Sequence, residues 1–227
     1  MGVSLYEGIS KNELNSARTT SEGKSYTINH PDELLVNMRY KGNTGSNVNS
    51  QGWERSSSYY FKELQNRHPE CFSKKNNLLI ESGRSPIVDK RFAEVFPQYK
   101  NFKGETLVHH HIGQDGQAVA IPQSIHKGSG EIHTVENYLG VTNKAQVFSK
   151  SCEGACKRNP SLIGQTSDKF KSLHVERTKS NGCSKGGVGK SPVASNSIKN
   201  ATHKSQKTSD GNHRMNLHGK NAIRTRS

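Results

Sequence analysis

The hydrophobic positions of the chain gather in its middle and leave both ends polar. Residues 1–52 are rich in turn-forming residues, with one short amphipathic stretch at 31–40, so we expect a polar leader or linker there. Regular structure is predicted to begin near Trp53. Of the 15 aromatic residues, only Phe148 and Phe170 follow residue 144, so we expect little buried core beyond that point.

Two helices are predicted in the first part of this middle region. The serines at 56–58 can cap a helix through residues 59–65 that ends before Pro69. A second helix is predicted over residues 85–96, because Ser85 is a good N-cap, a proline follows it, and the apolar residues then recur at helical spacing. These helices are expected to pack behind whatever follows them.

The next stretch has the pattern of a β-hairpin that leads into a helix. Two β-prone runs, 105–112 and 117–121, flank a Gly-Gln-Asp-Gly turn. Pro122 then suits the start of a short helix through His126, and residues 134–139 offer another helical turn that a glycine closes. The predicted order is therefore strand, strand, helix.

Charge is distributed unevenly and changes what can be expected of the last third of the chain. Hydrophobic residues make up 30% of the sequence, against roughly 45–50% apolar residues, glycine included, in ordinary globular domains. Residues 1–144 hold 17 basic and 15 acidic residues, whereas residues 145–227 hold 16 and 4. We therefore predict a basic, mostly disordered tail over 145–227.

No run of about 18 apolar residues exists, and the first residues lack the pattern of a signal peptide. A soluble protein without a membrane partner is expected. The four cysteines, Cys71, Cys152, Cys156 and Cys183, are too few and too irregularly spaced for a disulfide framework, which favours a reducing compartment. Those after residue 144 are expected to be free thiols.

Histidines carry the most informative signal in the chain. Five of the 11, His109, His110, His111, His126 and His133, fall between residues 109 and 133. Neutral imidazole binds borderline divalent metals and can accept a proton near neutral pH. Successive strand residues face opposite sides of a sheet, so one histidine of the run can bind metal while its neighbour meets water.

Residues 107–133 resemble the ββα-metal (His-Me) finger of the HNH/endonuclease VII superfamily, in particular bacterial nuclease toxins with an HHH signature. The resemblance rests on the hairpin, the histidines and the sequence LVHHHIGQDGQAVAIPQSIHKGSGEIH. The resemblance is best over residues 53–141 and absent from the tail. It implies an α+β fold with a leader at 1–52, a nuclease domain at 53–144 and the basic tail at 145–227.

The resemblance also implies site residues. His110 is expected as the general base, with His109 and His126 as metal ligands; a shift by one residue, with His111 as base and His110 as ligand, stays open. His133 could be a third ligand or a phosphate contact, and Glu105 an outer partner that orients an imidazole.

The sequence departs from the commoner HNH pattern, because no Asp-His pair and no obvious Asn lie at the expected places. Support of the transition state is then expected from Gln114, Gln117 or Ser124.

These expectations together describe a metal-dependent endonuclease that hydrolyses phosphodiester bonds, with DNA favoured over RNA and without a sequence-reading element. The resemblance implies one divalent ion (Zn, Mg, Mn or Ni), a cognate immunity protein, and an antibacterial toxin. Such a toxin would be exported by a specialised system without a signal peptide, or act in the cytoplasm of the target cell. Oligomeric state is not predicted.

The sequence also raises four other interpretations. A non-enzymatic, basic nucleic-acid-binding protein could hold a structural zinc ion in the same histidines. A homing or restriction-type nuclease would cut one site. The stretch 185–191 resembles a phosphate-binding loop, but no buried strand precedes it and a proline follows it, so nucleotide binding is not expected. Zinc binding by Cys152, Cys156, Cys183 and His174 lacks the usual paired spacing.

Overall fold

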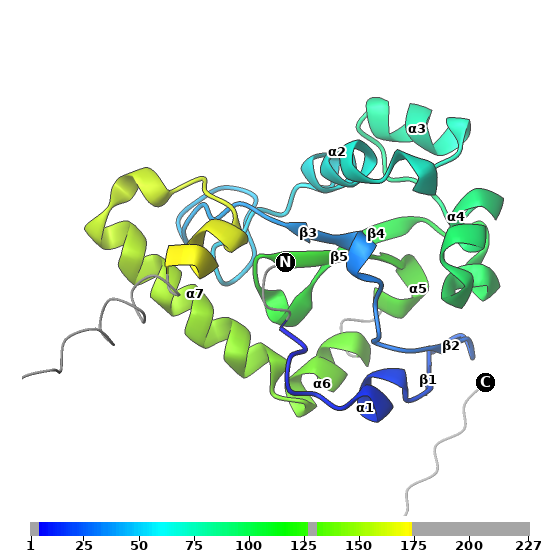
Figure 1. Ribbon diagram of the computed structural model, residues 1–227, viewed down its shortest axis with the longest axis horizontal. Helices are drawn as coiled ribbons and strands as arrows, with labels where there is room; N and C mark the ends of the chain where they lie inside the picture. Colours follow the sequence, from blue (N-terminus) through cyan, green and yellow to red (C-terminus); the bar gives the residue numbers. More distant parts are fainter. Residues whose placement is uncertain (1–4, 127–130, 174–227) are drawn as a thin grey trace, which may run out of the picture. The chain divides into compact units, whose positions relative to one another are not determined.

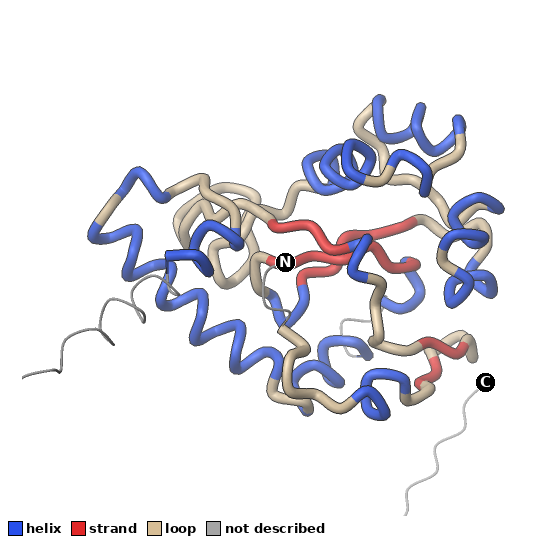
Figure 2. The backbone as a smooth tube through the Cα atoms, viewed as in Figure 1, coloured by secondary structure: helices blue, strands red, loops and turns tan. Residues whose placement is uncertain are grey.

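A three-stranded antiparallel sheet carries the histidine run (Figures 1 and 2). The strands lie in the order β3 (Leu35–Asn37), β5 (Gln117–Pro122) and β4 (Leu107–His111), with β5 in the centre. The structure is a computed structural model that describes residues 5–126 and 131–173, all within one compact unit. A smaller sheet pairs β1 (Arg18–Thr19) with β2 (Ser25–Tyr26). The mixture of helices and antiparallel strands confirms the α+β class.

Helices lie on both faces of the three-stranded sheet (Figure 1). Helix α2 packs on β3 and β4, whereas α5 packs on β4 and β5 from the other side and contacts α6 in turn. The helices are α1 (Lys11–Asn15), α2 (Ser57–Arg67), α3 (Lys74–Glu81), α4 (Lys90–Val95), α5 (Gln123–His126), α6 (Glu131–Tyr138) and α7 (Val141–Arg158). Short 3-10 helices are η1 (Asp32–Leu34), η2 (Pro69–Cys71), η3 (Pro97–Phe102), η4 (Ile112–Gln114) and η5 (Pro160–Leu162).

Capping side chains determine where the helices begin. The Ser56 hydroxyl accepts a hydrogen bond from the Tyr59 amide at 3.2 Å, so α2 starts where the sequence predicted. The second predicted helix was placed too early. Its cap is Asp89, which accepts from the Phe92 amide at 2.9 Å, and Ile87 instead pairs with Thr106 as a β-bridge.

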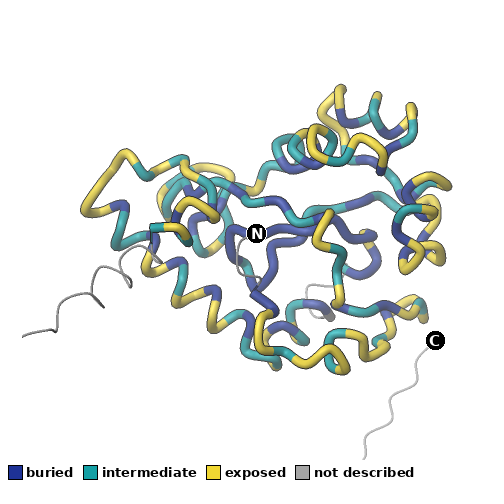
Figure 3. Tube along the Cα trace, viewed as in Figure 1, coloured by how far each residue is buried: buried dark blue, intermediate teal, exposed yellow. Residues whose placement is uncertain are grey.

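The expectation that residues 1–52 form a linker needs correction. Strand β3 pairs with β5 along its whole length, and residues 34 to 40 alternate between buried and half-buried positions. This alternation is the period of a strand with one covered face. Leu34 and Met38 are fully buried, so the core begins well before Trp53. Figure 3 shows the central strands in the colours of buried and half-buried residues. The division of function into leader, nuclease domain and tail stays a prediction.

The expectation of disorder from residue 145 is also wrong for the part that the structure describes. Helix α7 buries a stripe of small side chains: Val141, Ala145, Ser149, Cys152 and Cys156. The two cysteines are free thiols, as expected, but they pack in a second core cluster with Tyr40, Trp53 and Phe170 instead of lying in a loose tail.

Sequence features further along lie outside the described residues. They are Cys183, His174 and the stretch 185–191. Among the helices of the described part, none combines the length and the apolar character that a bilayer crossing requires.

Candidate active site

Strand β4 presents its three histidines on two faces. The rings of His109 and His111 lie on one face, with centroids 5.4 Å apart. The ring of His110 faces the other way, with its centroid 5.4 Å from that of His126 and 4.8 Å from that of His133. This is the alternation that a strand imposes on neighbouring side chains. Neighbouring histidines therefore meet different surroundings.

On the face of the sheet where His110 lies, the structure brings His110, His126 and His133 together. Each offers one ring nitrogen, and the three nitrogens lie within 4.8 Å of one another. His110 is buried, while His126 on α5 and His133 on α6 are half-buried. Burial, followed by the neighbouring His110, lowers the pKa of His126 to about 4, and the same two causes lower the pKa of His133. Both imidazoles are thus neutral near pH 7, the form that ligates metal.

A buried carboxylate that sequence reasoning missed lies behind this cluster. Glu136 on α6 has no exposed side-chain surface, and its Oε1 accepts a hydrogen bond from His110 Nε2 at 2.8 Å. Burial raises the pKa of Glu136, but attraction to His110 and hydrogen bonds from His110, Gly113 and Tyr6 outweigh it and lower the pKa. The ionised carboxylate therefore requires the His110 proton on Nε2.

These residues fit a divalent cation. The Nδ1 atom of His110 is buried and has no hydrogen-bond partner among the described residues, which is unusual for a buried nitrogen. The group has three members in the described part of the chain, all imidazoles. Three imidazoles suit zinc, nickel or a similar ion and leave a coordination position open for water or substrate.

On the opposite face, which His109 and His111 share, His111 is held in one tautomer by the backbone. Its Nδ1–H donates to the carbonyl oxygen of Asp115 at 2.7 Å, and its buried Nε2 has no hydrogen-bond partner among the described residues. Burial lowers the pKa of His111 to about 4, against the raising effect of the Asp115 and Glu54 backbone. At neutral pH the ring thus carries its lone pair on the buried Nε2.

His109 lies beside His111 and outside the three-histidine group. Its ring stacks on Tyr60 of α2 at a centroid distance of 5.6 Å, and its Nδ1 is 3.2 Å from the Ser57 hydroxyl. Burial, then the neighbouring His111 and Arg55, lowers the pKa of His109 to about 3. The geometry therefore favours the register in which His110 binds metal over the register in which His109 does.

Comparison with known proteins finds a family match over the part of the chain that holds these histidines. A family model described as an HNH/Endo VII superfamily nuclease toxin with a HHH motif matches residues 32–134. The match confirms, over residues 32–134, the resemblance to this superfamily that the sequence showed. No curated protein and no solved structure matches the chain. The match includes β3, α2, the hairpin, α5 and His133, and it identifies the substrate class of the nuclease toxin domain as nucleic acid.

A buried hydrogen-bond chain links Asp115, whose carbonyl oxygen orients His111, to helix α7, which lies beyond the matched residues. Trp53 Nε1 donates to the Ser149 hydroxyl at 2.9 Å, and that hydroxyl donates to Asp115 Oδ1 at 3.3 Å. A Cβ on Gly116 would lie 2.5 Å from the Trp53 ring, so only glycine fits beside Asp115. Burial raises the pKa of Asp115 to about 6. Helix α7 thus helps to hold the carbonyl that orients His111.

The other predicted residues lie near the nuclease site but have different neighbours. Glu105 accepts from the Ser124 amide at 3.0 Å and pairs with Lys24, so it holds the start of α5 and contacts no imidazole directly. Gln117 Oε1 accepts from the Leu5 amide, and Gln114 Oε1 accepts from the Ser50 hydroxyl. Both glutamine oxygens already have partners.

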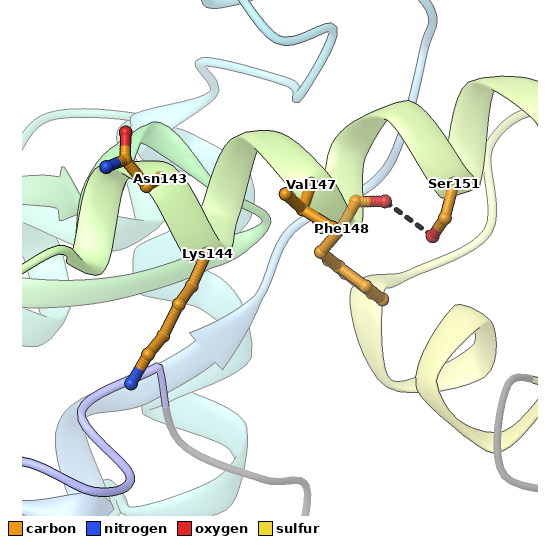
Figure 4. Close-up of a pocket in the computed structure, with 5 residues that line it drawn as sticks. All are labelled: Asn143, Lys144, Val147, Phe148 and Ser151. Atoms are coloured by element: carbon orange, nitrogen blue, oxygen red, sulfur yellow. Dashed lines mark hydrogen bonds between the residues drawn. The ribbon is translucent and has the colours of Figure 1, made fainter. Parts of the chain in front are cut away.

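A separate hollow of about 450 Å³ runs along the exposed side of α7 (Figure 4). Asn143, Lys144, Val147, Phe148 and Ser151 line it, and the Ser151 hydroxyl donates to the Phe148 carbonyl oxygen at 2.7 Å. The lining contains no histidine, cysteine or carboxylate. This hollow therefore offers none of the groups that the nuclease reaction needs.

Proposed function

We propose that the protein is a metal-dependent endonuclease in which His110, His126 and His133 bind one divalent cation. The observation that carries the proposal is the convergence of three imidazole nitrogens, one from each histidine, within 4.8 Å. Beside it, the buried Nδ1 of His110 has no hydrogen-bond partner among the described residues. A sealed structural zinc site would need a fourth protein ligand. The three-membered group favours an open, catalytic site instead.

In this proposal His111 is the general base. Its Nδ1–H is engaged by the Asp115 carbonyl, so the lone pair on Nε2 is the one that can take a proton from water. The water oxygen then bonds to phosphorus, the bond from phosphorus to the leaving sugar oxygen breaks, and that oxygen takes a proton from solvent. When bound, the cation stabilises the negative charge that develops on the phosphate.

These roles correspond to the second of the two registers that the sequence left open. His109 then contributes by packing, because Tyr60 and Ser57 already hold its ring. The guanidinium of Arg55, which lowers the pKa values of His109, His111 and His126, lies near all three rings and is suited to attract a phosphate.

We propose DNA as the preferred substrate and RNA as the alternative, with cutting that is not specific for sequence. A net charge of +14 favours any polyanion and does not distinguish the two. A nuclease toxin must be silenced in the cell that makes it, so a cognate immunity protein is the expected protein partner.

The proposal is tested by incubating the full chain with supercoiled plasmid or structured RNA and Zn²⁺, Mg²⁺, Mn²⁺ or Ni²⁺, with and without excess chelator. We expect nicking at many positions, abolished by chelator and restored by one of the ions. Cleavage that persists in chelator contradicts the metal requirement. A single reproducible cut on a long substrate contradicts unspecific cutting.

A further inference from the structure

Residues 5–7, the first that the structure describes, lie against the three-histidine group. Tyr6 is buried, with 8% of its surface exposed, and its hydroxyl donates to Glu136 Oε1 at 2.8 Å. The Leu5 amide donates to Gln117 on β5, and Lys144 Nζ on α7 donates to the Glu7 carbonyl oxygen at 2.8 Å. Figure 4 shows Lys144 reaching from α7 toward this segment. Three contacts thus fix the position of residues 5–7.

Glu136 is the point where this segment meets the histidines. Its carboxylate accepts hydrogen bonds from Tyr6 and His110 at Oε1, and from the Gly113 amide at Oε2 at 2.9 Å. Gly113 has a φ of +57°, and a Cβ there would lie 3.0 Å from the Val141 carbonyl oxygen. A side chain at that position would push the amide away from Glu136. The carboxylate is therefore held from three directions.

The hydrogen bond from His110 determines which of its nitrogens can bind a cation. A neutral imidazole carries one proton, so a proton on Nε2 leaves the lone pair on Nδ1. Within the described part of the chain, the Nδ1 atom has no hydrogen-bond partner. If Glu136 lost its position or its charge, the proton could move to Nδ1 and that nitrogen could no longer ligate.

We propose that Tyr6 and Glu136 are positioning residues that hold His110 in the tautomer with its lone pair on Nδ1. The inference rests on the proposed metal site. It adds that the working unit is longer than the family match, because Tyr6 precedes residue 32 and Glu136 follows residue 134. Carboxylates that orient ligating histidines typically contribute about 10- to 100-fold to metal affinity.

The test uses the full chain and two matched pairs of variants. Glu136→Gln keeps the shape but replaces an acceptor with an N–H group, and Glu94→Gln makes the same change at an exposed surface position. Tyr6→Phe removes one hydroxyl, and Tyr138→Phe removes the hydroxyl of a tyrosine that is 85% exposed. Zn²⁺ affinity is measured by calorimetric titration, and the tautomer of His110 by ring ¹⁵N shifts in metal-free protein.

We expect the wild type to show a proton on His110 Nε2, and Glu136→Gln to weaken Zn²⁺ binding by about 10- to 100-fold. Tyr6→Phe should weaken it by about 2- to 10-fold, the effect of one net hydrogen bond. Both should populate the second tautomer, whereas both control variants should match the wild type.

Two results would overturn the inference. One is a wild-type His110 with its proton on Nδ1, which needs no variant to observe. The other is wild-type Zn²⁺ affinity in folded Tyr6→Phe together with an unchanged tautomer. A wild type that binds no metal at all would instead refute the proposed function itself, so the two failures are distinguishable.

Discussion

The two faces of strand β4 give neighbouring histidines different surroundings. On one face, His110 meets His126, His133 and a buried carboxylate, and its Nδ1 has no hydrogen-bond partner among the described residues. On the other face, His111 meets a backbone carbonyl and keeps its Nε2 lone pair. One face groups three imidazoles, and the other holds the two rings of His109 and His111. The partner of each ring selects the nitrogen that is left to act.

The comparison also shows that the two faces depend on different parts of the chain. The three-histidine face is held by Glu136 and by Tyr6 near the start of the chain. The His111 face is held through Asp115 by Ser149 of α7 and by Trp53. Changes to one face should therefore leave the other largely intact, because hydrogen-bond networks without shared partners act almost additively.

The largest effect is expected on the three-histidine face. His126→Ala and His133→Ala each remove one of three ligands, so metal-dependent cleavage should fall by about 10³-fold or more, since the cation supplies several kcal/mol of transition-state stabilisation. Plasmid nicking measures the loss of cleavage, and Zn²⁺ titration measures the loss of metal affinity. Either variant retaining both tight binding and full cleavage would remove that histidine from the site.

The next effect should separate the two faces. His111→Ala is expected to slow cleavage by about 10²- to 10⁴-fold, the contribution of a general base, with Zn²⁺ affinity close to that of the wild type. His109→Ala removes a neighbouring ring from the same face and should slow cleavage much less. If His109→Ala is the more damaging of the two, the base has been assigned to the wrong histidine.

A stability effect should follow from Asp115 on the His111 face. Burial raises its folded pKa to about 6, above the ordinary value of 3.8. The protonated Asp115 side chain thus contributes to the free energy of unfolding below pH 4. This contribution, at most about 3 kcal/mol, is lost as pH rises through 6. Asp115→Asn does not titrate, so we expect its stability relative to wild type to rise between pH 4.5 and 7.5.

Urea unfolding at the two pH values measures this difference, with Glu94→Gln as the control at an exposed position. A gap between wild type and Asp115→Asn that is the same at both pH values would mean that the carboxyl group does not titrate in this range. Asp115 would then hold His111 only through its backbone.

The smallest effect is expected at Glu105. Glu105→Gln keeps an oxygen that can accept from the Ser124 amide but loses the charge opposite Lys24, which is one third exposed. The cost should stay below about 1 kcal/mol, because exposed ion pairs contribute little. Zn²⁺ affinity should change less than in Glu136→Gln. A larger loss of affinity would show that Glu105 orients a ligand after all.

The sequence predicted the hairpin and the grouping of histidines because both depend on short-range patterns. Gly and Asp punctuate the turn, and the alternation along β4 separates His110 from its neighbours. The register of base and ligand could not be predicted. It depends on which face of the strand meets α5 and α6, and that packing is decided by residues far along the chain.

Two structural partners left no recognisable signal in the sequence. In the sequence Glu136 looks like an ordinary helical glutamate, because Tyr6, whose hydroxyl donates to it, lies 130 positions away. Helix α7 was missed because its buried stripe consists of small residues such as Ala145, Ser149 and Cys152, which a count of large apolar side chains overlooks. In β3, by contrast, the alternation of Leu34, Val36 and Met38 was a readable strand signal.

The central claim is that His110 binds the cation through Nδ1 while His111 stays free. Anomalous diffraction from crystals of the full chain grown with Zn²⁺ tests it directly. The account predicts one ion at about 2.0–2.1 Å from His110 Nδ1, with His126 and His133 as the other protein ligands. An ion held by His109 or His111, or one enclosed by four protein ligands, would contradict it.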